Sequence, residues 1–401
     1  MHVFFDTETH RFRPGTMAPP IVCVQWCVDD GAAQLMTRRG EFAHASGALA
    51  PPSGNTFSSL LAYWINQGAT LVGHHIAYDM ATLCAQDAEL VPLVFAAYKR
   101  NQVTDTLLRQ QLADIGRGKL RGCFHGPAWV PIQYDLGSVG ARHGYKVDKN
   151  DPWRLHYDLL SDVPLADWPG FTATVADERK GAKPGDEVRL VGEQAIEYAL
   201  GDPLATRAAY VGQAQRYPAE LLVDEFSQAR KFWALDLASY WGLRTSLRGV
   251  QSLESGARER HEELGAMLLE ASLVRPKSRR DATLARDTKA AKERMRRASD
   301  GLGLEHDGFP LRLTKSGEVC LDSDACNSSG DPLLEAYAEF SSMSKVLSND
   351  VEMLRKGTVV PMHTRFNIAE TGRVTSSGPN VQNMRRLPGV REAFVPRGYR
   401  G

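Results

Sequence analysis

The sequence of 401 residues has few cysteines, no long apolar run and no excess of either charge. Its six cysteines are too sparse for a disulfide framework, and the spacing of Cys23 and Cys27, like that of Cys320 and Cys326, does not fit a Cys-x-x-Cys zinc pair. No apolar run approaches the ~18 residues of a membrane span, and the N-terminus lacks a signal-peptide pattern. These absences exclude secreted, membrane, fibrous and structural-zinc proteins, and they predict a cytoplasmic chain with reduced thiols.

Positive charge is concentrated in two segments, although 48 lysines and arginines balance 48 acidic residues over the whole chain. Residues 275–297 include ten Lys or Arg and three Asp or Glu, and residues 355–400 include nine and two. Such runs are most often solvated helix faces and less often nucleic-acid-binding surfaces. From the charge alone, both interpretations stay open.

The apolar pattern predicts an α/β first region followed by a mainly helical second region. The length suits two or three domains of ~150 residues each. We expect strands at 2–5, 21–28, 32–37 and 69–73, and a surface hairpin formed by 171–175 and 187–191. We expect helices at 56–67, from about residue 78, from 192 through 210, and from 219 to 240.

Carboxylates occur in three short segments of the first region. Asp6 and Glu8 stand two residues apart at the end of a strand, so both side chains leave the same face of the sheet. Neighbouring carboxylates repel each other unless a cation lies between them, and their hard oxygen ligands suit magnesium or manganese. Asp79 follows a buried strand, at the edge where open α/β sheets place ligands. Tyr198 and Asp202 share one face of a helix.

These three segments resemble the motifs of the proofreading 3′–5′ exonuclease domain of the DEDD superfamily, in its tyrosine-containing branch. The motifs read FDTET at 5–9, GHHIAYD at 73–79, and Tyr-x-x-x-Asp at 198–202. The resemblance implies that Asp6, Glu8, Asp79 and Asp202 bind two divalent metal ions, Mg²⁺ or Mn²⁺, and that Tyr198 orients the attacking water. Two such ions can hold both the nucleophile and the leaving group of phosphodiester hydrolysis.

Two positions depart from the pattern of that branch. The second motif usually has Asn where His75 stands, so the resemblance implies an altered contact with the terminal nucleotide of the substrate. Pro203 directly follows Asp202 and removes a helical N–H, which predicts a kink in the helix. The implied set of metal ligands is complete.

A second resemblance covers the C-terminal part of the chain. Residues 363–396 resemble the block that opens the palm of family A DNA polymerases. The matching segments read HTRFN, TGRVTSS and PNVQN within 363–383, and REAFVP at 391–396. The segments 151–154 and 168–169 resemble the exonuclease of phage-type members, and 310–317 resembles an element that follows the thumb. The basic run 275–297 then falls in the thumb, where Lys and Arg contact duplex phosphates.

The resemblance implies DNA-binding residues in the thumb and in the palm-opening block. Arg373 is expected in the minor groove of the primer terminus, where it would read pairing geometry rather than sequence. The implied substrate-binding residues are His75, Arg279, Arg280, Arg294, Arg296, Arg373, Asn380, Gln382 and Asn383.

The expected organisation is α/β and then mainly α. It comprises a ribonuclease H-like 3′–5′ exonuclease domain at 1–212, a thumb region at 213–358, and the first part of a palm at 359–401. The expected partner is DNA, as a primer–template duplex and as a single-stranded 3′ end. The family's first polymerase aspartate would follow Gly401, so we expect polymerisation to need a second chain or a downstream segment. Because the exonuclease motifs begin at the N-terminus, we expect no 5′-nuclease domain, as in phage-type members, and a phage-type chain is expected in the host cytoplasm.

Two alternatives remain. The first is a stand-alone DEDD exonuclease acting on DNA or RNA, which would have no use for the palm-opening block. The second is a non-catalytic clamp that binds primer–template DNA, which would have no use for the carboxylates.

Overall fold

The computed structural model shows a mixed α/β protein that divides into two compact units. The first unit contains Met1–Gly242 and His363–Gln382, and the second contains Leu243–Met362 and Asn383–Gly401. The functional division into exonuclease, thumb and palm at 212 and 358 stays a prediction. The structure describes residues 1–13, 15–44, 56–125, 128–146, 153, 156–171, 173–174, 187–188, 192–278, 281, 283–300 and 310–397.

A six-stranded sheet forms the centre of the first unit, with the strand order β4-β3-β2-β1-β5-β6. β1 pairs with β2 in antiparallel and with β5 in parallel orientation. The four predicted strands are confirmed, and β1 continues beyond residue 5, so the first carboxylates lie within the strand. The strands are β1 (His2–Thr9), β2 (Ile21–Val28), β3 (Gln34–Thr37), β4 (Phe42–His44), β5 (Thr70–Gly73) and β6 (Val103–Asp105).

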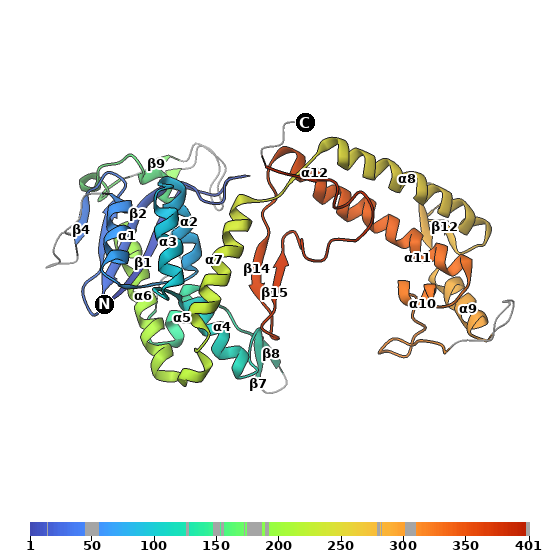
Figure 1. Cartoon of the computed structure of the whole chain (residues 1–401), viewed down its shortest axis with the longest axis horizontal. Helices are drawn as coiled ribbons and strands as arrows, with labels where there is room; N and C mark the ends of the chain where they lie inside the picture. Colours follow the sequence, from blue (N-terminus) through green and yellow to red (C-terminus); the bar gives the residue numbers. More distant parts are fainter. Residues whose placement is uncertain are drawn as a thin grey trace. The chain divides into compact units, whose positions relative to one another are not determined.

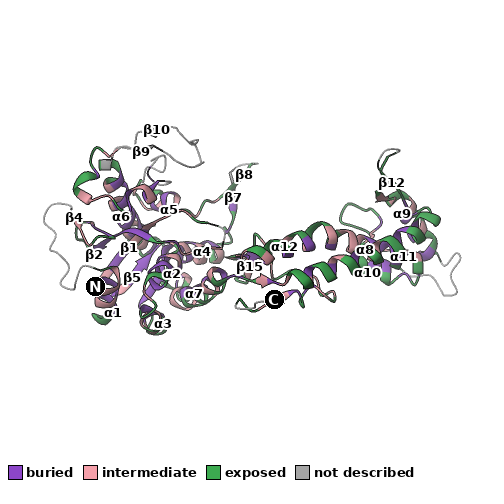
Figure 2. Ribbon diagram, turned by 90° about the horizontal axis from the view of Figure 1, so that it is seen from above, coloured by how far each residue is buried: buried purple, intermediate pink, exposed green. Residues whose placement is uncertain are grey.

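Helices cover both faces of this sheet (Figure 1). Phe4 of β1 packs against Leu200 and Leu204 of α6, whereas Val3 and Phe5 pack with α1 and α2 in the main core. The strands are therefore largely buried (Figure 2). The helices are α1 (Phe57–Asn66), α2 (Ile76–Gln86), α3 (Leu90–Lys99), α4 (Thr106–Gly116), α5 (Leu136–Arg142), α6 (Gly192–Arg216) and α7 (Glu225–Trp241).

Local sequence signals account for several helix boundaries. Thr56 caps α1 by accepting a hydrogen bond from the Ser59 amide, and Asp105 caps α4 in the same way. Pro203 lies inside α6, where it has no N–H to donate. Short 3₁₀ helices occur as η2 (Tyr157–Leu160), η3 (Leu165–Asp167) and η4 (Ala219–Leu221).

In the described part of the first unit, three small antiparallel strand pairs lie outside the central sheet. The predicted hairpin near 171–191 is confirmed as a shorter pair of strands. Residues 365–377, within the segment that resembles the palm-opening block, form a hairpin that packs on α7. The pairs are β7 (Gly122–His125) with β8 (Ala128–Pro131), β9 (Ala173–Thr174) with β10 (Glu187–Val188), and β14 (Arg365–Ile368) with β15 (Val374–Ser377).

The second unit is mainly helical, as the sequence predicts. Leu264 and Leu268 of α8 pack with Tyr337 and Phe340 of α11. Its helices are α8 (Leu247–Glu270), α9 (Thr288–Ser299), α10 (Ser323–Asn327), α11 (Pro332–Lys345), the π-helical η5 (Val346–Asp350) and α12 (Val351–Val359). Its strand pairs are β11 (Arg244–Thr245) with β16 (Phe394–Val395), and β12 (Val274–Pro276) with β13 (Leu284–Arg286). Among the described residues, no helix combines the length and apolar character needed to cross a membrane.

Candidate functional site

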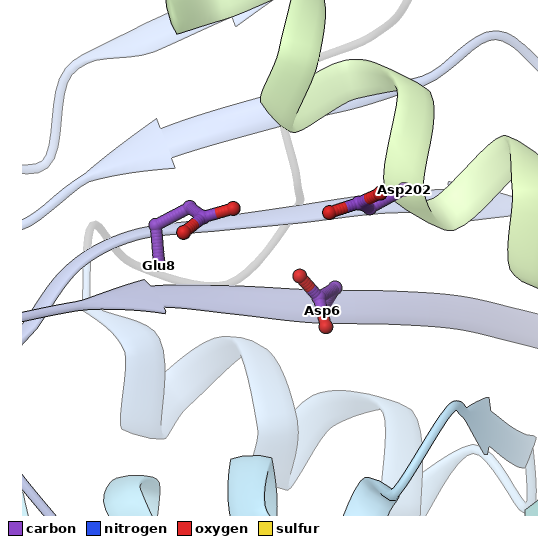
Figure 3. Close-up of side chains that lie close together, drawn as sticks. All are labelled: Asp6, Glu8 and Asp202. Atoms are coloured by element: carbon purple, nitrogen blue, oxygen red, sulfur yellow. The ribbon is translucent and has the colours of Figure 1, made fainter. Parts of the chain in front are cut away.

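Three carboxylates converge on one face of the central sheet, and we call them the carboxylate group. Asp6 and Glu8 come from β1, and Asp202 comes from α6, which packs on β1 and β2. A carboxylate oxygen of each lies within 4.8 Å of those of the other two. Figure 3 shows the three side chains directed toward one another. Asp202 is buried, whereas Asp6 and Glu8 are partly exposed, so the group can be reached from solvent.

Residues of β2 hold the strand-borne carboxylates in place. Gln25 is fully buried, lies directly opposite Asp6 in the β1–β2 register, and donates from Nε2 to Asp6 Oδ2 at 2.9 Å. Cys23 lies opposite Glu8. Burial, together with the negative charges of Glu8 and Asp6, raises the pKa of the Cys23 thiol, which therefore stays neutral beside the carboxylates.

The donor set of the carboxylate group fits a divalent cation. Two unit negative charges 4.8 Å apart repel each other by about 3 kcal/mol at an effective dielectric constant of ~20. A cation among the three carboxylates would remove this cost. Carboxylate oxygens are the ligands that Mg²⁺ and Mn²⁺ prefer, and a neutral thiol does not compete with them.

The structure places Asp79 outside the carboxylate group. Asp79 lies in the first turn of α2, is buried, and accepts a hydrogen bond from Thr7 Oγ1 at 2.6 Å. Thr7 stands between Asp6 and Glu8, and alternate side chains of a strand point to opposite faces. Asp79 therefore lies on the α2 face of β1, whereas Asp202 lies on the α6 face. Burial raises the pKa of Asp79, against the hydrogen bond from Thr7, which lowers it. The role of Asp79 as a metal ligand stays a prediction.

Tyr198 lies one helical turn before Asp202 on α6, as the spacing predicts. Its ring is buried, and the ring centroid lies 6.2 Å from that of Tyr157. Tyr157 is itself fixed, because its hydroxyl donates to the carbonyl oxygen of Ala195 at 2.5 Å. An aromatic cluster thus restricts the position of Tyr198 beside the carboxylate group.

His75 joins the polar residues on the α2 face. It adopts φ of 64°, a left-handed conformation in which Asn and His are enriched, and its amide donates to Asp105 Oδ1 at 3.1 Å. Its Nε2 lies 3.4 Å from Asp236 Oδ2 of α7. The His75 side chain is about half exposed; desolvation lowers its pKa, but the nearby carboxylates of Asp236, Asp105 and Asp79 outweigh this and raise it to about 9.

The predicted substrate-binding residues between 373 and 383 lie at the two ends of the β14–β15 hairpin. Arg373 is exposed at the turn that joins the two strands. At the other end, the Ser376 hydroxyl donates to Asn380 Oδ1 at 3.0 Å and accepts from the Gln382 amide at 3.1 Å. Asn383 is exposed. Ser376 thus orients two of the predicted substrate-binding residues.

Of the four arginines predicted to contact DNA from the thumb region, the structure describes two, and these differ in their surroundings. Arg294 Nε lies 2.6 Å from Oδ2 of the buried Asp331, which also caps α11, so Arg294 supports the helical core. Arg296 is exposed and lies 3.6 Å from Glu293, which leaves it available to a phosphate. Arg279 and Arg280 lie outside the described residues.

Sequence reasoning missed three supporting residues: Gln25, Thr7 and Asp236. Gln25 carries a readable signal, because it is the one amide within the apolar run of β2. Thr7 and Asp236 act across long sequence separations and leave no local signal.

Comparison with solved structures identifies the fold as similar to that of a DNA polymerase domain. The similar structure is "POL domain of Pol1 from M. smegmatis complex with DNA primer-template and dNTP", with a TM-score of 0.51 and 15% sequence identity. The match covers 98% of this chain and 54% of that chain, so this chain spans about half the length of its structural neighbour. No protein-family model and no curated protein matches the sequence.

Proposed function

We propose that this chain is part of a family A-type DNA polymerase and carries a metal-dependent 3′–5′ exonuclease in its first unit. The observation that carries the proposal is the convergence of Asp6, Glu8 and Asp202 from β1 and α6, in the order and spacing of the DEDD motifs. The similarity to a polymerase domain along nearly the whole chain supports the polymerase part. The carboxylate group argues against the alternative of a non-catalytic DNA-binding clamp, because such a clamp would have no use for three converging carboxylates.

Each residue of the site then has a distinct task. Asp6, Glu8 and Asp202, with Asp79 as the predicted fourth ligand, would hold the divalent cations, and Gln25 would fix the orientation of Asp6. When bound, the cations would supply Lewis-acid activation of water and stabilise the departing 3′ oxygen. A phenol is a weak base at neutral pH, so Tyr198 would position the attacking water by a hydrogen bond rather than deprotonate it.

Primer–template binding is proposed for the β14–β15 hairpin and the basic second unit. Arg373 at the hairpin turn and Arg296 on α9 are both exposed cations. The proposal assigns polymerisation to the polymerase of which this chain is a part, with further palm and fingers supplied by additional sequence or by a second chain.

Degradation of a 5′-labelled single-stranded oligodeoxynucleotide tests the exonuclease. With magnesium or manganese, the wild-type chain should shorten the DNA from its 3′ end, and the double variant Asp6→Ala/Glu8→Ala should not. The matched control is Asp30→Ala/Glu89→Ala, which removes two exposed carboxylates of the same unit. The exonuclease proposal fails if the wild-type chain degrades nothing with either metal, or if the site variant is as active as the control.

A further inference from the structure

The helices α4, α5 and α6 belong to the first unit (Figure 1), and a basic pocket lies at their C-terminal ends. It has a volume of about 390 Å³, within the range of ligand sites. Its charged lining residues are Asp114, Arg117, Lys119, Arg142 and Arg216. Four cations against one carboxylate give the pocket a formal charge of +3.

Two of the arginines are held in place by one buried carboxylate. Asp114 lies 3.7 Å from Arg117 Nη1 and 3.6 Å from Arg142 Nη1, and its Oδ2 also accepts hydrogen bonds from Gln110 and Tyr134 at 3.1 and 3.0 Å. The guanidinium of Arg117 lies 5.4 Å over the ring of Tyr217, and that of Arg142 lies 5.3 Å over the ring of Tyr134. Stacking and a shared counterion thus preorganise both guanidinium groups.

The other two cations supply charge that the pocket does not neutralise. Arg216 Nη1 donates to the main-chain carbonyl oxygen of Arg142 at 3.2 Å, and Lys119 is exposed. Within the described part of the chain, neither Lys119 nor Arg216 forms an ion pair. The neighbouring His143 responds to this field, because burial and then the charges of Arg216 and Arg142 lower its pKa to about 4.

We propose that this pocket binds a phosphate group, taken either from a nucleic-acid backbone or from a free phosphate anion. The guanidinium groups of Arg117 and Arg216, with the ammonium of Lys119, are the donors that would contact phosphate oxygens. Arg142 contributes positive charge, because its Nε and Nη2 donate to the carbonyl oxygens of Ser138 and Gln133. The site is separate from the carboxylate group, because Asp202 and Arg216 stand 14 residues apart on α6, or about 21 Å along the helix axis. The nucleic-acid source rests on the proposed function, whereas the phosphate chemistry does not.

The test uses the full chain in EDTA, so that its result does not depend on nuclease activity. Binding of a fluorescent 12-nucleotide oligothymidylate is measured by anisotropy at several salt concentrations, and binding of inorganic phosphate is measured by calorimetry. The variant is Lys119→Ala/Arg216→Ala, and the control is Lys99→Ala/Lys231→Ala, which removes two exposed lysines outside the pocket. Lys119→Glu, which leaves the arginines and Asp114 intact, is a second variant.

If the source is the nucleic-acid backbone, the double variant should weaken oligonucleotide binding about 10-fold. The slope of the logarithm of the binding constant against the logarithm of the salt concentration should fall by about 1.4, because each of the two lost phosphate contacts contributes ~0.7 on single-stranded DNA. If the source is a free anion, only phosphate binding should fall. Lys119→Glu should act in the same direction in either case. Binding of both probes that matches the control variant would overturn the proposal. The exonuclease proposal would be unaffected, because it is tested separately with metal present.

Discussion

Glu8→Gln should stabilise the metal-free protein and remove its response to magnesium. Glu8 takes part in two of the three carboxylate pairs, and at a separation of 4.8 Å or less each pair costs at least about 3 kcal/mol at an effective dielectric constant of ~20, before solvent screening. Glu8 is partly exposed, so solvent screening reduces that cost, and we expect a gain of about 1–2 kcal/mol in the free energy of unfolding. Gln preserves the size of the side chain, and its partial exposure avoids a cavity.

Thermal unfolding in EDTA and in magnesium chloride measures both effects. A gain of that size corresponds to an increase in Tm of about 2–8 °C for a unit of this length. Magnesium should raise the Tm of the wild-type chain and have little effect on Glu8→Gln, because a bound cation stabilises only the folded state. Glu89→Gln, at an exposed position that does not cap α3 through its side chain, is the matched control. A lower Tm for Glu8→Gln in EDTA, or equal stabilisation of both proteins by magnesium, would refute the reasoning.

Three further predictions concern single residues. Tyr198→Phe should reduce the exonuclease rate by roughly 10²-fold at saturating metal while preserving magnesium stabilisation, and an unchanged rate would remove Tyr198 from the mechanism. Arg296→Ala should reduce the salt slope of duplex binding by about 0.9 with little loss of stability. Arg294→Ala should instead lower the free energy of unfolding by roughly 1–2 kcal/mol, because it removes the ion-pair partner of Asp331. Equal melting curves for the two variants would contradict this contrast. The carboxylates of Asp236, Asp105 and Asp79 raise the pKa of His75 to about 9, so its contribution to stability is complete below pH ~6.5 and is lost as the pH rises to about 9. In His75→Asn, the free energy of unfolding should change less with pH over that range. An unaltered pH profile would exclude the ion pair.

Periodicity predicted the local elements because each is determined by nearby residues. The apolar run of β2 is buried along nearly its whole length, and the spacing of Leu60, Leu61 and Trp64 produces the buried face of α1. The common direction of Asp6 and Glu8 also follows from strand alternation alone. Their meeting with Asp202 does not, since it depends on how α6 packs, and only the motif resemblance predicted it.

Long-range contacts set the limit of what the sequence predicts. The pairing of Arg294 with Asp331 joins positions 37 residues apart, so the basic run gave no sign that one of its arginines supports the core. The segment His363–Gln382 returns to the first unit after the helices of the second, which no composition change marks. The sequence predicts that Asp79 follows a buried strand, and it lies in the first turn of the helix after β5, but the sequence did not indicate which face of β1 that helix covers.

β1 separates two sets of charged residues by its alternation. Asp6 and Glu8 face α6 and form the carboxylate group, whereas Thr7 between them faces α2 and donates to Asp79. Beyond Asp79 on that face, His75 and Asp236 form an ion pair, and the pKa of His75 is raised by the carboxylates of the protein itself. In this arrangement Asp6, Glu8 and Asp202 bring their carboxylate oxygens together, and the hydrogen bond from Thr7 joins Asp79 of α2 to the strand that carries two of them, while the role of Asp79 as a metal ligand stays a prediction. Since Thr7 ties Asp79 to that strand, a change in the position of β1 on metal binding would reach α2 directly.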